Sequence, residues 1–272
     1  MSLRVKFLEI NSWIFNAGSI EVVVDPVLAS ALDFGMPYLY TGRRKLLDGQ
    51  DELLNIIRSS DYVLLSQSID DHCHVPTIKV LSSERPDLIY IAPPSSVDIL
   101  TACGVASQMI RVLSHGDTLS LLKGHDTVKI TTTIGASVGP PWSTRENGYI
   151  LNYNDVCSLY YEPHGMFLES ELQREDYRAD YVIAPMVSQR LLSYTLVNGW
   201  GKAVELARLL KARAIIPMAN GDLVQSGLLS KLIQFRGSVQ ETREFLQRHK
   251  NDLEVLDVYP GQSILLSSSA VT

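Results

Sequence analysis

Short apolar runs rich in β-branched residues recur along the first two thirds of the chain, and this recurrence limits the fold more than any other feature. Such runs, bounded by turn residues, predict strands rather than helices. Helical spacing appears between some of them, at 49–61 and 95–105. The predicted strands include VKFLEI (5–10), IEVVVDP (20–26), DYVLLS (61–66), LIYIAP (88–93), DTVKITTTIG (126–135), GYILNYN (148–154) and CSLYYEP (157–163).

The last third of the chain alternates predicted strands and helices. ADYVIAP and RAIIPM are predicted strands on either side of the helical run GKAVELARLLKA. Apolar residues at three- and four-residue spacing predict helix from about Gly227 to Lys250, divided at Gly237. Two short strands are expected in LEVLDVYPGQSILL. Together these patterns predict one mixed α/β layered domain over residues 1–272, with residues 28–49 as a surface loop or lid.

Composition narrows the classes of function. The formal net charge of −6 and the lack of an extended Lys/Arg stripe disfavour nucleic-acid binding. The sequence contains no run of about eighteen apolar residues, so it predicts no membrane-spanning helix. The 3 cysteines are widely spaced and odd in number, which suits a reducing compartment rather than a disulfide framework. Because no secretory signal is visible at the N-terminus, we expect a cytoplasmic protein. We also expect its substrate or ligand to be a small molecule.

Polar side chains cluster where several predicted strands end. In α/β folds such strand ends tend to carry the chemistry. If these ends converge, their carboxylates and imidazoles form one site. Trp142 and Tyr161 are aromatic candidates for a pocket wall, and alternation along the strand allows only one of Tyr160 and Tyr161 to face inward. The polar candidates are Asp25, Asp71, His72, His74, Glu162, His164, Asn220 and Asp222.

The order of these motifs resembles the metallo-β-lactamase fold superfamily. The resemblance lies in the branch of hydrolases similar to ascorbate-phosphate lactonases and N-acyl-phosphatidylethanolamine phospholipases. It extends over nearly the whole chain and is similar in detail to a cyanobacterial and plant subgroup called metallo-hydrolase-like. It implies an αββα sandwich, with two facing mixed β-sheets flanked by helices. The matching segments are IEVVVDPVL, YVLLSQSIDDH, RVLSHGDTLSL, NGYILNYNDVCSLYYEPHG, GPPWSTRENGY and AIIPMANGD.

The metal motif of that superfamily is incomplete here. Where its H-x-H-x-D-H sequence belongs, the chain has Gln67 and Ile69 in place of the leading histidines, followed by Asp71 and His72. An isoleucine cannot bind a metal, and a neutral amide is a poor zinc ligand. The resemblance implies that the first metal position lacks ligands, while the second keeps Asp71, His72 and His164. The expected cofactor is one weakly or partly bound Zn²⁺, Mn²⁺ or Fe²⁺, or none.

The resemblance also suggests roles for individual residues. Asp71, His72, Glu162 and His164 would be catalytic, and Trp142, Tyr161 and Asn220 would contact substrate. Capping a following helix is an alternative for Asn220 and the stronger interpretation for Asp222. A surface loop is an equal alternative for His74. The residues expected to support the site from behind are Asp25, Gln67, His74 and Asp222.

Three functions remain open. The first is a mononuclear metal-dependent hydrolase acting on an ester, phosphoester or lactone, in which the metal activates a water molecule. The second is a non-catalytic ligand-binding or regulatory protein that retains the fold without the metal. The third is metal-free acid–base catalysis by Glu162 and His164. The metal content of the purified protein separates the first function from the second.

Overall fold

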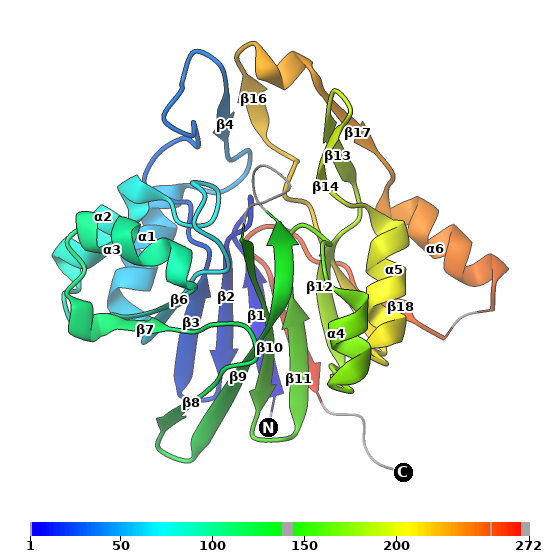
Figure 1. Ribbon diagram of the computed structural model, residues 1–272, viewed down its shortest axis with the longest axis horizontal. Helices are drawn as coiled ribbons and strands as arrows, with labels where there is room; N and C mark the ends of the chain where they lie inside the picture. Colours follow the sequence, from blue (N-terminus) through cyan, green and yellow to red (C-terminus); the bar gives the residue numbers. More distant parts are fainter. Residues whose placement is uncertain (1, 138–143, 251, 268–272) are drawn as a thin grey trace.

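Two seven-stranded β-sheets stack face to face in the computed structural model, which describes residues 2–137, 144–250 and 252–267 (Figure 1). The strand order across the first sheet is β19 (Ser263–Ser267), β1 (Ser2–Phe7), β2 (Trp13–Ala17), β3 (Ile20–Val24), β5 (Tyr62–Leu64), β6 (Ile89–Ala92) and β7 (Ile110–Val112). Neighbours from β19 to β3 are antiparallel, and neighbours from β3 to β7 are parallel. The first sheet is therefore mixed.

The second sheet is also mixed. Its strand order is β18 (Glu254–Val255), β15 (Ala214–Met218), β12 (Tyr181–Pro185), β11 (Cys157–Tyr161), β10 (Arg145–Tyr153), β9 (Asp126–Ser137) and β8 (Thr118–Lys123). Neighbours from β8 to β11 are antiparallel, whereas β11, β12, β15 and β18 run parallel. Because β11, β12 and β15 point the same way, the loops that follow them emerge at one end of the sheet.

The main core lies between the two sheets. Strand β2 shows the alternation that builds it, since Trp13, Phe15 and Ala17 are buried while the residues between them are half-exposed. Phe15 meets Tyr161 of the facing sheet edge-to-face, with ring centroids 6.2 Å apart. The inner faces of both sheets thus interdigitate around large aromatic side chains.

Helices cover both outer faces, which completes the αββα sandwich (Figure 1). On the first sheet lie α1 (Gly49–Ser59), α2 (Val75–Glu84) and α3 (Val97–Ala102), with the 3₁₀ turns η1 (Pro94–Ser96) and η2 (Ser107–Met109). On the second sheet lie α4 (Glu169–Arg174), α5 (Trp200–Leu209) and α6 (Val239–Arg248). Within the described residues, no helix is long and apolar enough to cross a bilayer.

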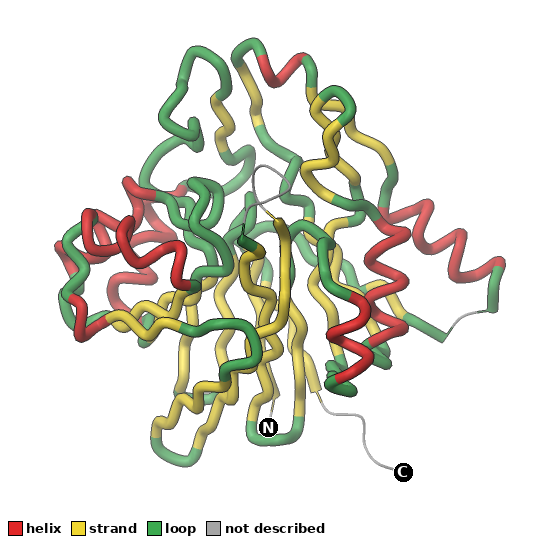
Figure 2. Tube along the Cα trace, in the orientation of Figure 1, coloured by secondary structure: helices red, strands yellow, loops and turns green. Residues whose placement is uncertain are grey.

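An outer layer extends beyond one end of the sandwich, on the side where loops predominate (Figure 2). It contains a three-stranded sheet of β14 (Tyr194–Val197), β13 (Ser188–Leu191) and β17 (Ile233–Arg236). It also contains the pair β4 (Thr41–Arg43) and β16 (Val224–Ser226), followed by η3 (Leu229–Lys231). The predicted loop at 28–49 therefore carries a short strand that is paired with the chain about 180 residues later.

The helix predicted from Gly227 to Gly237 was wrong. This segment forms η3 and strand β17, and only α6 confirms the second half of the prediction. Gly227 and Gly237 have φ angles of 94° and 99°, a conformation that interrupts a helix and that glycine adopts readily, and β17 between them pairs with β13. The helix expected to follow Asp222 is likewise absent, since β16 comes next, so capping by Asp222 was also wrong.

Candidate functional site

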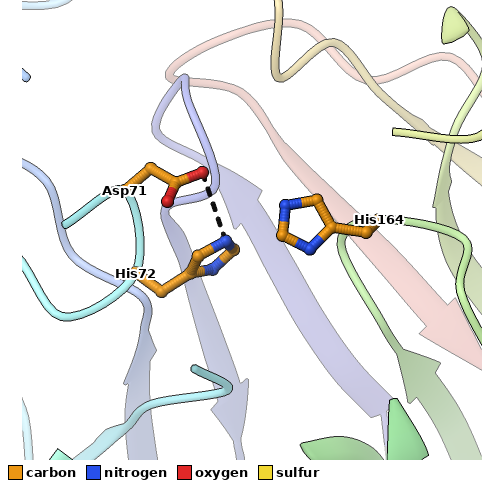
Figure 3. A group of neighbouring side chains, drawn as sticks. All are labelled: Asp71, His72 and His164. Carbon is orange, nitrogen blue, oxygen red and sulfur yellow. Dashed lines mark ion pairs between the residues drawn. The ribbon is translucent and has the colours of Figure 1, made fainter. Parts of the chain in front are cut away.

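The candidate site lies at the end of the sandwich where the loops after β5, β11 and β15 meet. The first loop carries Asp71 and His72, the second His164, and the third Asn220. Asp71, His72 and His164 each offer a ligand atom, and these atoms lie within 4.8 Å of one another (Figure 3). Strand geometry explains the convergence, because these loops follow parallel neighbours within each of two facing sheets.

Asp25 holds His72 from behind. It follows β3 with a φ angle of 43°, and its Oδ2 lies 2.7 Å from His72 Nδ1. The same carboxylate accepts hydrogen bonds from the Ser66 backbone N–H at 2.7 Å, the Ser66 hydroxyl at 2.5 Å and the Tyr161 hydroxyl at 2.8 Å. A carboxylate on one imidazole nitrogen orients the ring and leaves the other nitrogen facing the site. That second nitrogen, His72 Nε2, lies 3.3 Å from Asp71 Oδ2.

Asn11 is a site residue that the sequence analysis missed. Its Nδ2 donates to the backbone oxygen and to Oδ2 of Asp71, both at 3.1 Å, and lies 3.2 Å from His72 Nε2. It sits in the turn between β1 and β2, where Glu9 and Ile10 have positive φ angles of 66° and 55°. Polar residues between two strand-like runs were the only signal, and they are equally typical of an ordinary turn.

The charges of the buried groups depend on one another. Burial alone would lower the pKa of His72, but the Asp71 and Asp25 carboxylates outweigh it and raise this pKa to about 10. Burial opposes ionisation of Asp71, yet the positive charge and hydrogen bond of His72 keep its pKa below the usual value. Without a metal, His72 therefore carries a proton at neutral pH. A metal ion must displace that proton to use Nε2.

His164 is uncharged and contacts Gln67. Burial and the neighbouring His72 lower the pKa of His164 to about 4. Its Nδ1 lies 2.7 Å from Gln67 Nε2, and Gln67 is fully buried. If the amide is turned so that its oxygen accepts from Nδ1–H, Nε2 of His164 keeps a free lone pair. Gln67 therefore orients the candidate ligand His164 and is not itself a candidate ligand.

Glu162 is turned away from the cluster. Its carboxylate accepts from the backbone N–H of Met166 at 2.6 Å and of His164 at 3.3 Å, which ties the loop after β11 together. Burial raises the pKa of Glu162 to about 7, against the effect of these hydrogen bonds. Glu162 is absent from the lining of the cavity described below.

The other predicted residues fall into different places. His74 is buried at the start of α2, with Nδ1 2.7 Å from Thr77 Oγ1, and is neither a surface residue nor part of the cluster. Asp222 is exposed and forms an ion pair with Lys45. Tyr161 is fully buried against Asp25, behind the cavity wall. Trp142 lies outside the described residues.

A cavity of about 280 Å³ opens above the cluster. Asn11, Asp71, His164 and Asn220 reach it from the ends of the sandwich strands. Asn220 accepts from Gln189 Nε2 at 3.1 Å and donates to the Pro163 backbone oxygen at 3.2 Å, so it joins two walls. The rest of the lining is mainly apolar and comes from the outer layer, including Leu32, Phe34, Leu191, Leu196, Leu223 and Leu229.

The residues of the cluster fit one metal ion. Asp71, His72 and His164 are a carboxylate and two imidazoles, a set that zinc accepts in catalytic sites. Asp71 Oδ1 is buried and has no hydrogen-bond partner among the described residues. Buried polar atoms are normally paired, so this part of the site is built for a further donor or a cation. Within the described residues, no other group of at least three such side chains comes together in this way.

Comparison with known proteins identifies similar chains. Residues 4–219 match the family described as the Beta-lactamase superfamily domain. The isothiocyanate hydrolase from Delia radicum gut bacteria is 15% identical with a TM-score of 0.70, covering 98% of this chain and 100% of that one. Igni18, a metallo hydrolase from Ignicoccus hospitalis, is 14% identical with a TM-score of 0.65, covering 99% and 100%.

YhfI from Bacillus subtilis, a metallo-beta-lactamase fold protein, is 12% identical with a TM-score of 0.62, covering 97% of this chain and 100% of that one. No curated protein matched the sequence. At such identities the likeness to solved structures concerns the fold, and the match to the family supplies the relationship.

Proposed function

The chain belongs to the Beta-lactamase superfamily domain family, and from that premise we propose that it is a hydrolase using one weakly held metal ion. The substrate would be a small molecule with an ester, phosphoester or lactone linkage. The observation that carries this proposal is the meeting of Asp71, His72 and His164 within 4.8 Å, where Asp71 and His164 line a cavity. Three protein ligands with an open position are what a catalytic zinc site requires.

The residues of the chain would divide the work among them. Asp71, His72 and His164 would hold the metal, with Asp25 orienting His72 and Gln67 orienting His164. A bound metal ion supplies Lewis acidity and lowers the pKa of a water molecule. Asn11 holds Asp71 through two hydrogen bonds, and Asn220 fixes the loop that carries His164. The apolar outer layer would keep bulk water from the linkage to be cleaved.

A ligand-binding protein without metal chemistry is the second candidate. The observation in its favour is the position of His72, whose two nitrogens lie 2.7 Å and 3.3 Å from Asp25 and Asp71. An imidazolium between two carboxylates compensates their charge without a metal. In that case the cavity would bind a small molecule and leave it unchanged.

Zinc titration separates the two candidates. We expect metal-free protein to bind one Zn²⁺ per chain, and the His72→Ala and His164→Ala variants to bind it at least about 100-fold more weakly, because loss of a ligand exceeds the effect of losing an outer partner. The measurement is isothermal titration calorimetry at pH 7.5. The control is His125→Ala, which removes an exposed histidine.

Two results would defeat the metal proposal. Weak zinc binding that is the same in the wild type and in all three variants would favour the ligand-binding protein. Recovery of two metal ions per chain would show that other residues complete a binuclear centre.

A further inference from the structure

The cavity is polar at its floor and apolar on the walls above it. Loops at the ends of the sandwich strands line the floor, and most of the walls come from the outer layer. The outer layer extends beyond one end of the sandwich (Figure 1). Leu191 and Leu196 come from the hairpin β13–β14, and Leu32 and Phe34 from the segment before β4. A volume of about 280 Å³ is close to the lower limit of small-molecule sites, roughly 300–1,000 Å³.

Apolar side chains continue to the mouth of the cavity. Phe34 and Tyr194 line it and are 40% and 49% exposed. Large apolar side chains left partly in water around a cavity lose that exposure when an apolar ligand group lies against them. The walls and the mouth therefore favour a ligand with an extended apolar part.

The floor offers more acceptors than donors. Asn11 Oδ1 and Asp71 Oδ1 are buried atoms without a hydrogen-bond partner in the part of the chain that the structure describes, and both residues line the cavity. Asn11 is 2% exposed, and its Nδ2 donates a hydrogen bond to Asp71. This bond fixes the orientation of the amide, so Oδ1 points away from the Asp71 carboxylate. The oxygen and the nitrogen of the Asn220 side-chain amide each already have a hydrogen-bond partner. A ligand head group that donates hydrogen bonds would satisfy the free acceptors, whereas an anionic one would meet the Asp71 carboxylate.

We propose that the cavity takes a neutral amphiphilic ester, with a hydroxyl-bearing head group at Asn11 and Asp71 and an acyl chain between the 32–40 segment and the β13–β14 hairpin. The proposal rests on the proposed function for the ester linkage and for the location of the site. It narrows the substrate class, because it favours carboxylic esters over phosphoesters. The requirements that the ligand have an apolar chain and hydrogen-bond donors follow from the residues that line the cavity.

Binding in the presence of EDTA tests the ligand class apart from the metal. The probes are 1-octanoylglycerol, 1-butanoylglycerol, methyl octanoate and octyl phosphate, titrated calorimetrically into the full chain below their aggregation concentrations. We expect octanoylglycerol to bind up to about 200-fold more tightly than butanoylglycerol, the factor for about 0.8 kcal/mol per methylene. Methyl octanoate, which lacks the donors, should bind about 10-fold more weakly than octanoylglycerol.

A pair of variants locates the binding. Leu196→Gln changes a half-buried wall residue and should weaken octanoylglycerol binding at least about 10-fold. Leu265→Gln changes a side chain that is 62% exposed on β19, and should leave binding unchanged. Circular dichroism verifies that both variants are folded.

Several outcomes would overturn the proposal. Affinity independent of chain length, or equal losses in the two variants, would remove the acyl chain from the cavity. Octyl phosphate or methyl octanoate binding as tightly as octanoylglycerol would remove the donor-bearing head group. Zinc binding without octanoylglycerol binding would leave the metal proposal standing and reject this one. Octanoylglycerol binding without zinc binding would do the reverse.

Discussion

Replacing Asp25 by alanine should lower the free energy of unfolding by about 3–5 kcal/mol, the usual cost of removing one partner from a buried charged pair. The Asp25 carboxylate is fully buried and accepts from the Ser66 backbone, the Ser66 hydroxyl, the Tyr161 hydroxyl and His72. Its loss leaves the Ser66 backbone N–H without its acceptor and His72 with less compensation, while the Tyr161 hydroxyl keeps the Asn11 backbone oxygen. Urea denaturation at pH 7 measures the effect.

Asp222→Ala is the matched control for this prediction. Asp222 pairs with Lys45 on the surface, so its loss should change stability by less than about 1 kcal/mol. Asp25→Asn keeps the shape of the side chain and should fall between the two. A loss below about 1 kcal/mol for Asp25→Ala would show that the network around His72 does not hold the two sheets together.

Histidines at positions 67 and 69 should strengthen zinc binding at least about 100-fold. The family resemblance implies that Gln67 and Ile69 stand where the superfamily motif has its leading histidines. Gln67 already contacts His164, and Ile69 lines the same cavity as Asp71. The double substitution Gln67→His with Ile69→His adds imidazoles on the side of the existing ligands, and each added ligand should contribute at least about 10-fold. Calorimetric zinc titration compares the variant with the wild type.

The control for the added imidazoles is Gln67→Leu with Ile69→Leu, which removes the same amide without supplying ligands. It should show no gain in zinc affinity. His164→Ala in the restored background should reverse much of the gain, because His164 would share the metal with the new ligands. A restored variant that binds zinc no better than the leucine control would mean that residues 67 and 69 do not face the metal position.

Many strands and the mixed α/β class could be predicted because the local patterns agree with the tertiary contacts, whereas the αββα sandwich was implied by the family resemblance. The run at 20–24 is a strand both by composition and by its pairing with β2 and β5. The outer layer could not be predicted in this way. Leu228, Leu229, Leu232 and Ile233 are spaced like the apolar side of a helix, but pairing of β17 with β13 prevails over that spacing. The hairpin β13–β14 and helix α2 were not foreseen at all.

The candidate site shows the same limit. Asp71, His72 and His164 were selected because strand-end loops and the family motif both pointed to them, and the structure brings them together. Glu162 lies in the same motif, yet its carboxylate accepts hydrogen bonds from backbone N–H groups of its own loop. The conformation of that loop sets these bonds, and the spacing of residues in the sequence does not reveal it. Asn11 belongs to no motif. Its place follows from the strand order of the first sheet, which brings the turn between β1 and β2 next to the loop after β5, and only the assembled fold reveals that order.

Strand β19, formed by residues 263–267, pairs along the whole outer side of β1, which is formed by residues 2–7. During synthesis β1 leaves the ribosome before β19. Until then the edge of β1 exposes unpaired backbone groups, and such an edge readily joins strands of other chains. The contact also has a long sequence separation, which slows its formation. A nascent chain stalled before residue 263 would therefore be a target for chaperones, even though every ligand of the candidate site has already emerged.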